Sequence, residues 1–145
     1  MQPKFKITNR ILKPATLAMC LAMTAGTSMA QDKLPLSQET YIYGSLRSAA
    51  IGALIEKHCP TISARRVLAI WKARGLLSYA HDKGYTTAEV KAFVYDKAEQ
   101  DKMRRKAQVY LRKNGAVRGQ PESYCAIGRA EIKKGTLTGQ LLRES

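Results

Sequence analysis

The chain has 145 residues, with 25 lysines and arginines against 11 aspartates and glutamates, for a formal net charge of +14 at pH 7. This length allows one compact domain. A hydrophobic fraction of 45% excludes a disordered chain, and ten glycines and five prolines exclude a collagen-like or low-complexity sequence.

The first thirty residues have the pattern of a secretory signal peptide. Residues 1–13 carry four basic side chains and no acid, residues 15–25 are mostly apolar, and small residues follow them. This order predicts export with cleavage after Ala30. A transmembrane anchor is disfavoured because it needs roughly 20 apolar residues, about twice this run. Lipidation at Cys20 is disfavoured because the residue before it, Met19, is not small.

Export would leave residues 31–145, with 21 basic residues against 11 acidic ones and a net charge of +10. Two cysteines remain, Cys59 and Cys125, and an oxidising compartment favours their pairing. A disulfide would close a loop of about 66 residues, worth roughly 4 kcal/mol in the chain-entropy model. A free reactive thiol and a metal ligand are the alternatives. The absence of a C-x-x-C motif disfavours a thioredoxin-like redox pair and attachment of a c-type haem.

A loose leader is expected over residues 31–36, followed by a first helix over residues 37–58, where apolar side chains recur at spacings of three and four. A second helix is expected over residues 63–83, with Ser63 as its N-cap. This second helix is apolar on two sides, which predicts that it is the central helix of the domain.

A third helix is expected over residues 86–113. It begins with a capping box, in which the Thr86 hydroxyl accepts from the amide of Glu89 and the Glu89 carboxylate reaches back. Its middle is mostly charged, so we expect that part to face solvent.

A fourth helix is expected over residues 121–134, with Pro121 at its first position, and one or two further turns over residues 137–143. No stretch alternates at period two for long enough to predict a strand. The sequence therefore predicts an all-α fold: a single helical domain over residues 37–145, built as a small bundle of about four helices and clamped by the Cys59–Cys125 disulfide.

A basic cluster spans the end of the third helix and the loop after it. No acid occurs between residues 102 and 120. Within this stretch we single out five cations as candidate anion- or partner-binding residues: Arg104, Arg105, Arg112, Lys113 and Arg118. Such a patch attracts anions and raises association rates. Export disfavours nucleic acid as the ligand and favours anionic lipid, lipopolysaccharide or an acidic envelope protein. A solvated surface without function is the alternative.

The sequence contains no recognisable catalytic or metal-binding spacing. His58 and His81 lie near helix ends, where the helix dipole favours a cation, and no third metal ligand accompanies them. Five scattered glutamates have ordinary helical explanations as caps, first-turn charges and solvated faces: Glu56, Glu89, Glu99, Glu122 and Glu131. No nucleophile elbow, P-loop or dinucleotide-binding motif occurs.

We therefore expect no catalytic residue, no metal and no cofactor, and a non-catalytic interaction module in the periplasm. Two alternatives stay open. One is a small periplasmic enzyme with an unrecognised site. The other is a structural assembly subunit, which would leave a contiguous apolar patch on the surface of the bundle.

Several motifs, taken in order along the chain, resemble one known family. They are Cys59-Pro60-x-Ile62-Ser63-Ala64-Arg65, Gly84-Tyr85-Thr86 followed by Glu89-Val90-x-x-Phe93-Val94, Pro121-Glu122-Ser123-Tyr124-Cys125-x-x-Gly128 with Glu131-Ile132, and Gly135-x-x-x-Gly139-x-Leu141-Leu142. Over about residues 40–142 the chain resembles domain of unknown function 5333, a family of small exported proteins from Rhodobacter-type alphaproteobacteria. The resemblance implies a Gram-negative envelope location and paired cysteines. It assigns no activity and no functional residues.

Overall fold

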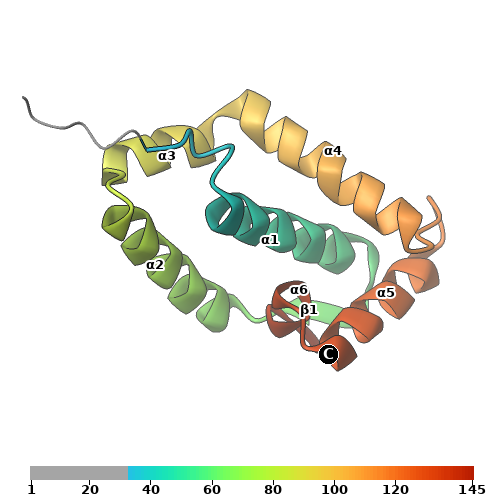
Figure 1. The fold of residues 1–145 in the computed structure, drawn as a ribbon. Coiled ribbons are helices and arrows are strands. Elements are labelled where there is room, and N and C mark those ends of the chain that lie inside the picture. Colours follow the sequence, from blue (N-terminus) through green and yellow to red (C-terminus); the bar gives the residue numbers. More distant parts are fainter. Residues whose placement is uncertain (1–32) are drawn as a thin grey trace, which may run out of the picture. The chain divides into compact units, whose positions relative to one another are not determined.

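The structure is a computed structural model that describes residues 33–145. The predicted signal peptide, its cleavage after Ala30 and the interpretation of Cys20 lie outside these residues. The described elements, in chain order, are α1 (Thr40–His58), β1 (Ile62–Ala64), α2 (Arg66–Asp82), α3 (Thr87–Tyr95), α4 (Lys97–Lys113), α5 (Pro121–Lys134), α6 (Leu137–Gln140) and β2 (Leu142–Glu144). The mostly helical architecture is confirmed (Figure 1). No helix in this part of the chain has the length and apolar character needed to cross a bilayer.

Helix α1 is the central element of the fold. It contacts α2, α4, α5, α6 and β1, and Figure 1 shows it between α2 and α4. Its buried isoleucines, Ile42, Ile51 and Ile55, supply apolar contacts along its whole length. The Glu39 carboxylate caps the first turn by accepting from the amide of Ile42 at 2.9 Å. The helix therefore begins three residues later than predicted.

The prediction that the second helix is central is wrong. Ser63 belongs to β1 and does not cap a helix. Ala80, near the end of α2, is buried, but Val67, Ile70 and Trp71 are 71%, 54% and 63% exposed. Apolar side chains from both of the predicted apolar sides therefore face solvent. Two apolar sides indicate a central helix only when both find partners, and here α1 takes that place.

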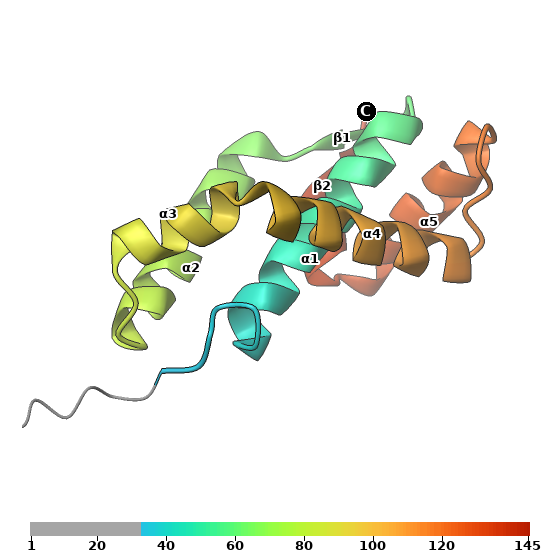
Figure 2. The ribbon, with the colours of Figure 1, turned by 90° about the horizontal axis from the view of Figure 1, so that it is seen from above.

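The prediction of one continuous third helix is also wrong, because the chain bends at Asp96 between α3 and α4 (Figure 2). The Asp96 carboxylate accepts from the amide of Glu99 at 2.8 Å and so caps a new helix. The predicted capping box of Thr86 and Glu89 is confirmed. The same three-residue spacing recurs from Asp96 to Glu99, so a second helix start is encoded within the predicted helix.

Two short strands contradict the prediction that the domain contains none. Strands β1 and β2 pair antiparallel with the partners Ile62 and Glu144, Ser63 and Arg143, and Ala64 and Leu142. Each strand has three residues, which is too few for an alternating pattern to be recognised. Their pairing ties the end of the chain to the segment that follows α1.

The predicted disulfide joins Cys59, at the end of α1, to Cys125 in α5. A cluster of buried side chains surrounds it, which we call the disulfide core: Ile51, Ile55, Cys59, Ile62, Ala107, Leu111, Ala116, Cys125, Ile127 and Leu142. Gly128 lets α5 approach closely, because a Cβ atom there would lie 2.4 Å from Cδ1 of Ile62. The disulfide therefore lies inside the larger of the two apolar clusters of the domain.

A smaller apolar cluster, which we call the second core, lies at the other end of α1. Its buried members are Leu36, Ile42, Ala80 and Tyr85. Phe93 of α3 packs against it. The second core therefore joins the start of α1 to the end of α2 and to α3.

Candidate functional site: a basic surface on α4 beside an apolar groove

Helix α4 has one buried side and one charged side. Met103, Ala107 and Leu111 are buried at intervals of four residues, and the helix packs on α1. Arg105 and Arg112 are seven residues apart, about two turns, and lie on the opposite side. The helix therefore presents guanidinium groups to solvent while its apolar side closes the core.

The five predicted cations define what we call the α4 basic surface: Arg104, Arg105, Arg112 and Lys113 on α4, and Arg118 in the loop before α5. All five are exposed, and within residues 33–145 none lies within 4.0 Å of a carboxylate. Two neighbouring lysines differ, because Lys102 pairs with Glu99 and Lys106 lies 4.8 Å from the centre of the Tyr43 ring. Lys102 and Lys106 therefore have intramolecular partners, whereas the five cations of the α4 basic surface face solvent.

The α4 basic surface is broad and does not converge on one point. Arg104 is turned about 100° around the helix from Arg105, and Lys113 is turned about 80° from Arg105 in the other direction. The cations therefore cover about half of the circumference of α4. This spread suits an extended anionic surface better than a single small anion.

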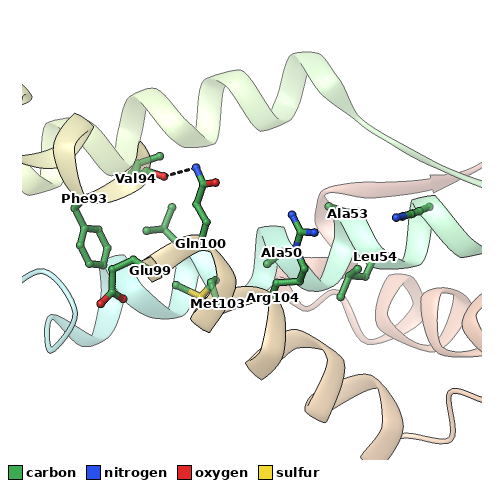
Figure 3. A pocket seen from close by; sticks show the side chains of 11 residues that line it. Ala50, Ala53, Leu54, Phe93, Val94, Glu99, Gln100, Met103 and Arg104 are labelled. Carbon is green, nitrogen blue, oxygen red and sulfur yellow. Dashed lines mark hydrogen bonds between the residues drawn. The ribbon is translucent and has the colours of Figure 1, made fainter. Parts of the chain in front are cut away.

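Next to Arg104, a groove of about 350 Å³ runs between α1, α3 and α4 (Figure 3). Its base is α1, through Leu46, Ala50, Ala53, Leu54 and Lys57. Its sides are Phe93 and Val94 of α3 and Glu99, Gln100, Met103 and Arg104 of α4. Helical periodicity assigns Ala53 to the buried stripe of α1, but its side chain is exposed in the groove. The groove was not predicted, because it depends on the bend between α3 and α4.

Figure 3 shows how the polar groups of the groove are distributed. Phe93 and Glu99 lie at one end, and Arg104 lies toward the end that holds Ala53. The Gln100 side chain donates to the carbonyl oxygen of Val94 at 2.9 Å, so that amide hydrogen is already engaged. The middle of the groove is mainly apolar.

A second exposed feature lies on α2. Val67, Ile70 and Trp71 form what we call the α2 apolar surface. The Arg74 guanidinium lies 5.4 Å from the centre of the Trp71 ring, a cation–π contact. An exposed tryptophan beside two exposed aliphatic side chains is uncommon on a solvated helix.

Glu131 contradicts the expectation that every glutamate has an ordinary helical explanation. It is 4% exposed, and its carboxylate accepts from the Tyr110 hydroxyl at 2.5 Å and from the Thr136 hydroxyl. The hydrogen bond to Glu131 raises the pKa of Tyr110 to about 12. Glu131 therefore links α4, α5 and the start of α6.

The two histidines lie in the last turns of their helices, as predicted. The ring of His58 lies 4.6 Å from the ring of Tyr124, and Nε2 of His81 lies 2.9 Å from Oγ1 of Thr87. In the part of the chain that the structure describes, no three His, Cys, Asp or Glu side chains form a group that could hold a metal ion.

Comparison with known proteins addresses the identity of the whole domain. No curated protein and no solved structure matches the chain. The model of a family of unknown function, DUF5333, matches residues 34–143, a span that includes every described helix. This match confirms the family indicated by the ordered motifs: the chain belongs to the family of unknown function DUF5333.

Proposed function

We propose that the chain is an exported, periplasmic, non-catalytic module that binds anionic components of a Gram-negative envelope through the α4 basic surface. One observation carries the proposal: five exposed cations lie on and just after one helix, without a carboxylate within 4.0 Å in residues 33–145. The predicted signal peptide would deliver the chain to an oxidising compartment. A disulfide such as Cys59–Cys125 persists there.

The physical basis of binding is the attraction of several cations to one charged surface. Each lysine or arginine near an anionic bilayer contributes about 1 kcal/mol, and salt screens this attraction. A surface spread around half of α4 can bring several guanidinium groups to lipid head groups at once. Affinity should therefore rise with the anionic lipid fraction and fall steeply with ionic strength.

Sedimentation with vesicles tests the proposal. We expect the protein to bind phosphatidylglycerol vesicles at low salt and to stay free with phosphatidylcholine vesicles. The variant Arg105→Glu/Arg112→Glu should lose binding. The control Lys72→Glu/Lys91→Glu removes the same charge from exposed positions on α2 and α3 and should keep most of it. Equal binding by the two variants would contradict the assignment to α4.

The same variants distinguish lipid from the other envelope ligands. Vesicles that contain lipopolysaccharide test that polymer directly. If no vesicle binds but envelope extracts yield an acidic protein that Arg105→Glu/Arg112→Glu fails to capture, the ligand is a protein partner. Each of these results keeps the α4 basic surface and changes only its ligand.

The α2 apolar surface supports a second candidate function, that of an assembly subunit. Association would cover Val67, Ile70 and Trp71 and remove apolar area from water. Sedimentation velocity at several concentrations should then show self-association that Trp71→Ala abolishes. Tyr95→Ala is the matched control, because Tyr95 is another highly exposed aromatic residue, on α3. A monomer at all concentrations would contradict self-association through α2.

A further inference from the structure

We propose that the groove between α1, α3 and α4 binds a single acyl chain that ends in a carboxylate, as a fatty acid does. This inference goes beyond the proposed function, because the groove shares only Arg104 with the α4 basic surface. It rests on the size of the groove, on its apolar middle and on the distribution of charge along it.

The size of the groove favours a small, elongated ligand. From Leu46 to Lys57 its base extends eleven residues along α1, about 16 Å. Its volume of about 350 Å³ lies at the lower end of the range for small-molecule sites. A partner helix is about 10–12 Å wide, and a stable protein interface buries more than about 1,000 Å². The groove suits one chain of methylene groups better than a helix.

The middle of the groove favours an apolar ligand. Ala50, Leu54 and Met103 contribute only hydrocarbon and a thioether. One of the two Gln100 amide hydrogens is engaged by the carbonyl oxygen of Val94. A polar group placed there would find few hydrogen-bond partners to replace water, whereas an acyl chain needs none. The small side chains of α1 provide the space.

Charge along the groove fixes the orientation of the ligand. Lys57 and Arg104 contribute positive charge, and within residues 33–145 neither lies within 4.0 Å of a carboxylate. Glu99 lies at the Phe93 end of the groove, and Arg104 lies farther along it, toward Ala53 (Figure 3). One Glu99 oxygen pairs with Lys102, and the other is buried without a hydrogen-bond partner among the described residues.

A carboxylate head group would be repelled at the Glu99 end of the groove. A guanidinium presents parallel N–H donors that match a carboxylate, so we place the head group at Arg104 and the acyl chain toward Phe93. Lys57 contributes a second cation to the lining of the groove.

Titration with dodecanoate, below its micelle concentration, tests the proposal. Met103 is the only methionine among residues 33–145, so its methyl signal in ¹³C-methionine-labelled protein reports on the groove. We expect a saturable shift of that signal. Ala53→Leu fills the groove and should weaken binding about tenfold or more. The control Ala49→Leu adds the same side chain at an exposed position of α1 outside the groove and should bind as the wild type does.

Replacing the two cations of the groove tests the orientation of the ligand. Lys57→Gln/Arg104→Gln should weaken dodecanoate binding about tenfold, the effect of losing one charged hydrogen bond, and leave dodecanol binding unchanged. Arg105→Gln removes the neighbouring cation outside the groove and should bind dodecanoate normally. If Arg105→Gln weakens binding equally, the fatty acid binds the general basic surface and the inference is wrong.

Two further outcomes would overturn the inference. Equal binding by Ala53→Leu and Ala49→Leu would exclude the groove as the site. A Met103 signal that moves with protein concentration in the absence of dodecanoate would show that a second copy covers the groove. Neither outcome bears on the proposed function, which the vesicle assay with Arg105→Glu/Arg112→Glu tests separately.

Discussion

The two ends of α1 are held by different interactions. At the C-terminal end, the Cys59–Cys125 disulfide and the β1–β2 pair join segments that are far apart in sequence. At the N-terminal end, the Glu39 carboxylate accepts from the hydroxyl of Tyr79 at 3.1 Å, next to the small second core. The disulfide core combines a covalent link with extensive burial, whereas the second core depends on fewer contacts.

This contrast predicts that the two regions open separately. Local opening begins where few apolar contacts hold an element. The N-terminal half of α2 is mostly exposed, so its amides should exchange before those of α5. The groove lies along α1 between the two regions, so its shape depends on both of them.

Removal of the disulfide should have the largest effect on stability. Cys59→Ala/Cys125→Ala frees a loop of 66 residues, and loss of a native disulfide from a small domain costs about 2–5 kcal/mol. Urea denaturation followed by circular dichroism measures this cost. An unchanged unfolding free energy would show that the covalent link adds nothing to the disulfide core.

Two glycine substitutions should change stability in opposite directions. In Gly128→Ala the new Cβ would lie 2.4 Å from Ile62 and 2.8 Å from Ile55, and overpacking of this kind costs about 1–3 kcal/mol. Gly44→Ala, in the N-terminal half of α1, meets nothing within 4 Å and should gain about 0.5–1 kcal/mol of helix propensity. Thermal melts of both variants give the comparison. If both substitutions changed stability in the same direction, the proposed difference in packing around the two glycines would be contradicted.

Tyr110→Phe should destabilise the fold next to the disulfide core, and the size of this loss should depend on pH. The loss of its hydrogen bond to buried Glu131 should cost about 1–3 kcal/mol at neutral pH. The pKa of Tyr110 rises from the usual 10.0 to about 12 on folding, so its contribution is complete below pH 10 and is lost as the pH rises toward 12. Denaturation at several pH values should show the difference between wild type and variant shrinking over that range. A constant difference would contradict this role.

Acid should loosen the start of α3, near the second core, and we expect this to be the smallest of these effects. The hydrogen bond from Lys33 and those from the Thr86 amide and hydroxyl lower the pKa of Glu89 from 4.5 to about 2. The stabilisation is therefore present above pH 4.5 and is lost as the pH falls toward 2. Hydrogen exchange at the start of α3 should accelerate over this range in the wild type, and Glu89→Gln should flatten that dependence. Identical profiles would show that the Glu89 charge does not hold α3.

Local signals predicted several elements correctly. The Thr86–Glu89 capping box starts α3, Pro121 starts α5, and the two cysteines of residues 31–145 allowed only one intramolecular pairing. Each of these signals involves residues a few positions apart or a simple count. The cap at Asp96 carried the same kind of signal. It lies in a charged stretch that we expected to be the solvent-facing middle of one continuous helix, so the bend was not predicted.

Features that depend on distant segments were not predictable. The pairing of Ser63 with Arg143 requires a partner 80 residues away, and a three-residue strand has no periodicity of its own. The burial of Glu131 depends on the Tyr110 hydroxyl of another helix. The sequence was enough to predict the basic cluster. It could not predict that Lys102 pairs with Glu99 or that a groove lies beside Arg104.

The most direct test of the α4 basic surface is the salt dependence of binding to phosphatidylglycerol vesicles. With fewer cations at the membrane, Arg105→Glu/Arg112→Glu should bind weakly at every salt concentration and show a flatter salt dependence than wild type. Lys72→Glu/Lys91→Glu should retain the steep dependence of the wild type. Parallel salt curves of equal affinity for both variants would show that net charge alone attracts the protein, and would contradict a dedicated surface on α4.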